Sequence, residues 1–148
     1  VIQPAKGYRI DYEGKSVVIS GDTIPNENVA TYGKDADILI HEVAAFQDRN
    51  VLPQVISHHT TPDQAGEIFA QAQPKLAVYS HFVNGIPGKV EGISDEEMIA
   101  RTKENYDGEV VLGGEPVIEL VHAPGNFAGV GVEAEIGKHI LYQALDIR

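Results

Sequence analysis

The sequence contains no cysteine. Disulfide bonds and thiolate metal sites are therefore excluded, and any metal would be bound by histidine and carboxylate side chains. No apolar run approaches the roughly 20 residues that cross a bilayer, and no basic segment followed by an apolar one marks a secretory signal. We expect a cytoplasmic protein.

Positive charge is scarce. Eleven lysine and arginine residues stand against 22 aspartates and glutamates, which gives a formal net charge of −11. Non-specific binding to nucleic acid requires a basic surface, and so does binding to an anionic membrane. The composition therefore predicts no nucleic-acid partner and no membrane partner. The length of 148 residues, 43% of them hydrophobic, is enough for one domain with its own core.

Apolar runs and turn signals predict an α/β domain. Residues 8–12 and 17–20 are typical of two strands joined by a turn, and 37–43 and 76–82 are typical of buried strands. Thr61, Pro62 and Gln64 form a helix start signal, and Ser94 with Glu97 forms another. Residues 130–136 and 139–146 predict an additional C-terminal hairpin, with a terminal helix as the alternative for the end of the chain.

Ionisable residues stand at the ends of three of these strands, and a His-His pair precedes the first capped helix. The same ends of neighbouring parallel strands meet at one rim of a sheet, and imidazole with carboxylate suits divalent metals. The candidate residues are Asp22, His41, Glu42, His59 and His81. Each has a structural alternative. Asp22 could be a turn residue or a helix N-cap, and His59 a helix-cap contact. His41 could be a hydrogen-bonded core residue, Glu42 its partner or a surface acid, and His81 an ordinary strand-end residue. His122 and His139 lie outside the pattern and are expected to be structural.

These motifs together resemble the second half of a metallo-β-lactamase-fold hydrolase, in the branch of tRNase Z-type phosphodiesterases and arylsulfatase-like proteins. The motifs are Ser20-Gly21-Asp22-Thr23, His41-Glu42, His59-Thr60-Thr61 and Ser80-His81-Phe82. The resemblance implies half of an αβ/βα sandwich: a mixed sheet with helices on one face, followed here by the additional hairpin. It implies a single domain over 1–148, with residues 1–121 as the family half and 122–148 as an atypical C-terminal extension.

The resemblance also implies roles for individual residues. Asp22 is similar to the carboxylate that bridges two zinc ions, and His81 to the last histidine ligand of the second ion. His59 resembles the residue that contacts a scissile phosphate or assists the leaving group. His41 and Glu42 resemble the pair that orients this histidine. The implied reaction is zinc-dependent hydrolysis of a phosphate, sulfate or carboxylic ester, with a small anionic or ester substrate.

The first half of the family carries a His-x-His-x-Asp-His cluster that this sequence does not contain. Two ligands are fewer than the three or four protein ligands of a zinc site, so the chain alone is not expected to be a competent enzyme. One hypothesis is an enzyme fragment whose complementing N-terminal half lies upstream or on another chain. A second is a non-catalytic binding module that forms a homodimer to cover its exposed apolar face. A third is a plain α/β domain in which the placement of these residues is accidental.

Overall fold

The computed structural model of the chain describes residues 6–47, 57–113 and 141–146, the last of these for the backbone only. They form one six-stranded sheet in the order β5-β4-β3-β2-β1-β6. The strands are β1 (Lys6–Tyr12), β2 (Lys15–Ile19), β3 (Ile38–Ala45), β4 (Leu76–Asn84), β5 (Val110–Leu112) and β6 (Leu141–Asp146). Strands β2 to β5 pair in parallel, whereas β1 pairs antiparallel with both β2 and β6. The mixed sheet expected from the sequence is confirmed.

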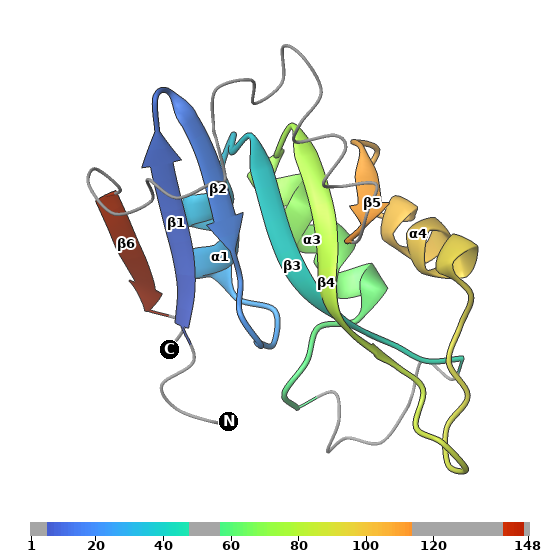
Figure 1. Cartoon of the computed structure of the whole chain (residues 1–148). Helices are drawn as coiled ribbons and strands as arrows, with labels where there is room; N and C mark the ends of the chain where they lie inside the picture. Colours follow the sequence, from blue (N-terminus) through green and yellow to red (C-terminus); the bar gives the residue numbers. More distant parts are fainter. Residues whose placement is uncertain (1–5, 48–56, 114–140, 147–148) are drawn as a thin grey trace.

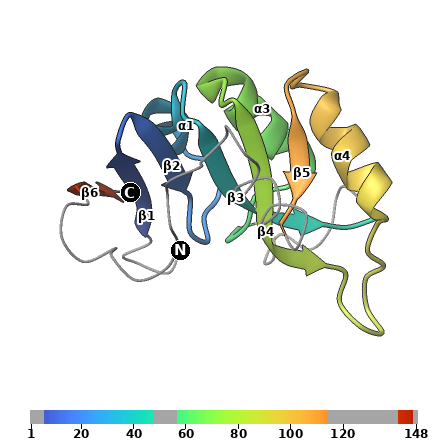
Figure 2. The same cartoon turned by 45° about the horizontal axis from the view of Figure 1, so that its top comes forward.

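The helices of the described segments all lie on one face of this sheet (Figures 1 and 2). They are α1 (Glu27–Gly33), α3 (Pro62–Ala72) and α4 (Asp95–Lys103). Each begins at an N-cap residue with a short polar side chain, which accepts a hydrogen bond from a backbone N–H of the first turn. The N-caps are Asn26 for α1, Thr61 for α3 and Ser94 for α4. Among the described residues, no helix is long and apolar enough to span a bilayer.

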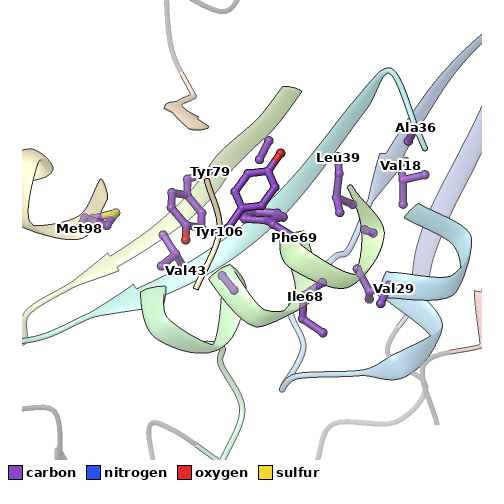
Figure 3. Close-up of a cluster of buried hydrophobic side chains, with 14 of the residues drawn as sticks. Val18, Val29, Ala36, Leu39, Val43, Ile68, Phe69, Tyr79, Met98 and Tyr106 are labelled. Carbon is purple, nitrogen blue, oxygen red and sulfur yellow. The ribbon is translucent and has the colours of Figure 1, made fainter. Parts of the chain in front are cut away.

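The main core lies between the sheet and the helices (Figure 3). Phe69 of α3 is at its centre, with ring contacts to Tyr79 of β4 and to Tyr106. The opposite face of the sheet carries a second apolar cluster built on Ile38, Leu76 and Val78. Central strands are therefore apolar on both faces, which is why they appear in the sequence as consecutive hydrophobic residues rather than as an alternation.

The end of the chain is a strand and not the helix that was the alternative. Residues 141–146 form β6 and pair antiparallel with β1, from Lys6 opposite Asp146 to Asp11 opposite Leu141. The first strand of the predicted hairpin, 130–136, lies outside the described residues.

Helix α3 begins with the capping box that the sequence predicts. The Thr61 hydroxyl accepts a hydrogen bond from the backbone N–H of Gln64, and the Gln64 side chain accepts one from the backbone N–H of Thr61. Because Thr61 lies two residues after His59, the cap also fixes the backbone that joins this histidine to the helix.

Removal of this cap should destabilise the fold measurably. We expect Thr61→Ala to lower the free energy of unfolding by about 1 kcal/mol, the usual cost of losing an N-cap side chain. Thr61→Ser keeps the hydroxyl and is the matched control, expected to stay near the wild-type value. Urea unfolding of the three proteins provides the measurement. Equal stability of the alanine and serine variants would contradict a capping role.

Candidate active site

The carboxyl ends of β2, β3 and β4 bring three of the predicted residues to one edge of the sheet. The register places Ile19 beside Ile40 and Glu42 beside Ser80. Asp22 follows β2, and His81 lies in β4 next to Ser80, so both stand at the level of Glu42. Parallel pairing therefore assembles this edge, as the strand-end pattern in the sequence indicates.

A sharp turn at Gly21 places Asp22. Gly21 has a φ of +64°, and a Cβ atom built on it would lie 2.5 Å from the carbonyl oxygen of Lys6. Only glycine fits both the left-handed backbone and this close approach. The turn leaves the Asp22 side chain 60% exposed, beside His81.

A bulge in β4 places His81. The pairing of β3 with β4 shifts between Glu42 and Val43, so that Ser80 and Phe82 are paired and His81 between them is not. His81 itself has a φ of +47°. Bulges redirect side chains and occur often beside active sites, and a non-glycine residue in the left-handed region is uncommon. The local backbone thus turns His81 out of the regular strand, with its side chain 52% exposed.

The positive φ of His81 reverses the usual effect of glycine on stability. In a regular strand, a protein with glycine is less stable than the same protein with alanine by about 0.5–1 kcal/mol. At the positive φ of His81 we expect the opposite, with His81→Gly more stable than His81→Ala by about 1 kcal/mol. Ser80, its neighbour in the regular part of β4, is the control position, where alanine should be the more stable. Thermal or urea unfolding of the four variants gives both differences, and alanine being preferred at position 81 would contradict the bulge.

Glu42 and His59 form a buried pair. The two meet at 3.0 Å between Glu42 Oε2 and His59 Nδ1. The other Glu42 oxygen accepts a 2.7 Å hydrogen bond from the backbone N–H of Thr60. The carboxyl group is 2% exposed, and burial raises its pKa to about 8, which the Thr60 hydrogen bond offsets only in part. The Glu42 carboxyl group therefore keeps its proton near neutral pH.

Four of the predicted residues form a row from the interior to the surface. The His59 ring stacks on the His81 ring at 5.9 Å between centroids and 24° between planes. His81 Nε2 in turn lies 3.5 Å from Asp22 Oδ2. The order is thus Glu42, His59, His81 and Asp22, with exposure rising along it.

His41 does not join this row. Its ring lies on the helix side of the sheet, fully buried and edge-on to Phe69 at 6.1 Å. Its Nδ1 donates to the backbone carbonyl oxygen of Glu42 at 2.7 Å, and its Nε2 has no hydrogen-bond partner among the residues that the structure describes. Burial lowers the pKa of His41 to about 4, so the ring is neutral. His41 therefore touches the backbone of Glu42, whereas only Glu42 touches His59.

Two further residues hold the site together; both stand in motifs quoted from the sequence, which gave them no role of their own. The Ser20 hydroxyl accepts a hydrogen bond from the backbone N–H of Glu42 at 3.2 Å. The Thr60 hydroxyl donates to the carbonyl oxygen of Thr23 at 2.7 Å. Both are short polar residues within two positions of a candidate site residue, and this closeness inside the quoted motifs was the signal in the sequence.

The donor set can be compared with the needs of zinc. Asp22 and His81 offer one carboxylate and one imidazole in mutual contact, which is the right chemistry for part of a zinc site. In the described segments, however, no group of three or more histidine, aspartate or glutamate side chains could hold a metal ion. These residues alone do not fit zinc, and any further donors must come from outside them.

Comparison with known proteins provides the family. Residues 3–82 match the family described as the Beta-lactamase superfamily domain. The chain is 30% identical over 128 residues to a ribonuclease Z of Mycobacterium avium, an alignment that spans 83% of this chain and 44% of the relative. It is 35% identical over 78 residues to a Caenorhabditis elegans protein named zinc phosphodiesterase ELAC protein 2 homolog, spanning 53% of this chain and 9% of that protein.

The fold has a solved counterpart. The crystal structure of the metallo-β-lactamase fold protein YhfI from Bacillus subtilis superimposes with a TM-score of 0.56 at 20% identity, over 71% of this chain and 39% of that one. The chain thus spans less than half the length of the M. avium relative and of this structure. The name of the C. elegans relative agrees with zinc as the metal of the family.

The expectation of no nucleic-acid partner is wrong. It rested on the net charge of −11, but relatives over most of the chain are named ribonuclease Z, after an RNA substrate. The physical reason for the error is that net charge is a sum over the whole surface. Contact with a phosphate depends on the few groups at a binding site, and a net charge does not describe them.

The matched domain covers more than half of the sequence, and the fold is half of the expected sandwich. The M. avium relative, which aligns with 83% of the chain, is named ribonuclease Z. The chain therefore belongs to the metallo-β-lactamase-fold hydrolase superfamily, in its ribonuclease Z branch.

Proposed function

We propose that this chain carries the C-terminal half of the active site of an RNA phosphodiesterase of the ribonuclease Z kind. The observation that carries the proposal is the row of Glu42, His59, His81 and Asp22 in a chain whose relatives are ribonucleases Z. Phosphodiesters of RNA thereby replace the wider set of phosphate, sulfate and carboxylic esters as the proposed substrates.

The proposed role of each residue follows from how exposed its side chain is. Asp22 and His81, at the exposed end, are the residues this chain would contribute toward zinc, together with donors from outside the described residues. His59 lies further in and would contact the scissile phosphate or the leaving oxygen. Glu42 is buried behind it and holds its ring.

The Glu42–His59 pair suits a general acid. The raised pKa of Glu42 favours a protonated carboxyl group at neutral pH, which donates to His59 Nδ1. The neutral His59 ring then carries its own proton on Nε2. When Nε2 gives that proton to the leaving oxygen, the Glu42 proton moves to Nδ1, so the ring stays neutral and Glu42 becomes a carboxylate. Such transfer typically contributes about 10²–10⁴-fold to a rate.

A chimera tests the proposal. This chain replaces the matching C-terminal segment of M. avium ribonuclease Z, and folding and zinc content are checked before activity is measured. We expect zinc-dependent cleavage of precursor tRNA and of bis(p-nitrophenyl) phosphate, with little action on p-nitrophenyl sulfate. Glu42→Gln and His59→Ala in the chimera should lower cleavage by about 10²-fold or more. A folded, zinc-loaded chimera that cleaves no phosphodiester would refute the proposal.

A non-catalytic binding module is the second candidate. The observation in its favour is the shortage of metal donors among the described residues. If the chimera is inactive while the 148-residue chain binds RNA without zinc, with an affinity that His59→Ala lowers, the module is the better description.

A further inference from the structure

We propose that Thr60 is a positioning residue that ties the turn bearing Asp22 to the Glu42–His59 pair. The inference rests on the proposed function in one respect only, namely that Asp22 and His59 serve the same site. The coupling itself is a property of the fold and is measured without metal or RNA.

Thr60 is fully buried and uses all three of its polar groups, two toward β3 and one toward the turn after β2. Its backbone N–H donates to Glu42 Oε1 at 2.7 Å, and its carbonyl oxygen accepts from the backbone N–H of Ala44 at 2.8 Å. Its hydroxyl donates to the carbonyl oxygen of Thr23 at 2.7 Å, across 37 positions in the sequence. The backbone bonds fix Thr60 to β3, and the hydroxyl alone reaches the turn after β2.

The turn is held from two sides at Thr23. Its carbonyl oxygen accepts from Thr60, and its backbone N–H hydrogen-bonds to the carboxyl group of Glu42. Thr23 is 4% exposed, so a carbonyl left without its donor is cut off from water as well. Asp22 directly precedes Thr23, and His59 directly precedes Thr60. The hydrogen bond from the Thr60 hydroxyl to Thr23 therefore joins the backbone next to Asp22 with the backbone next to His59.

The alternative is that Thr60 matters only as a small group that fills the interior. The two possibilities predict opposite behaviour for two near-isosteric changes. Thr60→Val keeps the shape and removes the hydroxyl, whereas Thr60→Ser keeps the hydroxyl and removes the methyl group. If the hydroxyl positions the turn, serine preserves the site and valine does not.

Thr102 is the matched control. It is also fully buried, and its hydroxyl bonds to Tyr79 and to the carbonyl oxygen of Met98, on the helix side of the molecule. Thr102→Val therefore removes a buried threonine hydroxyl without touching the turn.

The experiment is amide hydrogen exchange by NMR on the 148-residue chain and the three variants. The Thr23 amide reports the turn, and the Leu39 amide in the centre of β3 corrects for global stability. We expect Thr60→Val to raise the exchange rate of Thr23 relative to Leu39 by about tenfold, and Thr60→Ser and Thr102→Val to leave that ratio near the wild-type value. A Thr23 ratio unchanged in Thr60→Val, or raised equally in Thr60→Ser, would overturn the proposal. If Thr60→Val loses the protection of the Thr23 amide and the chimera is inactive, the nuclease function is refuted but the positioning role of Thr60 stands.

Discussion

Replacing Asp22 by alanine is expected to lower the zinc affinity of the chimera by about 100-fold or more, whereas replacing His59 by alanine should leave it nearly unchanged. The reason lies in position. Asp22 is the exposed carboxylate beside His81, and the family resemblance gives it the bridging role between two metal ions. His59 Nδ1 is occupied by Glu42, and its proposed contact is with substrate.

The two variants should differ in activity as well. His59→Ala should lower RNA cleavage by about 10²–10⁴-fold at saturating zinc, because a general acid is lost while the metal is retained. Asp22→Asn keeps the size of the side chain and removes its charge, and it should resemble Asp22→Ala. Zinc content by atomic spectroscopy and affinity by competition with a chelator provide the readouts. Equal loss of zinc in the Asp22 and His59 variants would contradict these roles.

Acidification should destabilise the chain through His41. Burial lowers the pKa of His41 from 6.5 to about 4, so the folded state keeps this ring neutral while the unfolded state takes up a proton. The stabilisation is fully present above pH 6.5 and is lost as the pH falls toward 4, by about 3 kcal/mol in total. No further loss from His41 is expected below that window, where both states are protonated.

The measurement is a difference between two proteins across pH. Glu42, with its raised pKa, acts in the opposite sense, since its contribution falls as the pH rises from about 4.5 toward 8. Subtracting the urea-unfolding curve of His41→Asn from that of the wild type removes this effect, because asparagine can still donate to the Glu42 carbonyl oxygen. A difference that does not vary between pH 4 and 6.5 would mean that His41 is not buried as a neutral ring.

Much of the fold was readable from local pattern. The apolar runs at 37–43 and 76–82 became β3 and β4, and the Thr61-Pro62-Gln64 signal became the start of α3. These elements are specified by residues near one another in the chain, through side-chain burial and capping. The strand-end residues Asp22, Glu42 and His81 were found for the same reason, since parallel strands bring their ends to one edge whatever their sequence separation.

Which of His41 and Glu42 faces the site could not be predicted from the sequence. Neighbours in a strand point to opposite faces, so only one of the two side chains can face the site. Which one does so depends on which face of β3 the helices cover. The bulge that turns out His81 was equally hidden, because it is a mismatch in length between β3 and β4 and neither strand reveals it alone.

The sequence by itself determined the main strands and helices and the edge at which the candidate residues meet, because these follow from short-range patterns along the chain. The family came from the resemblance of four short motifs. Only the tertiary structure decided which side chains touch: the pairing of Glu42 with His59, the stacking of His59 on His81, and the bond from Thr60 to Thr23. Those contacts join positions that are far apart in sequence, and they depend on strand register and backbone direction to within an ångström or so, which residue types alone do not encode.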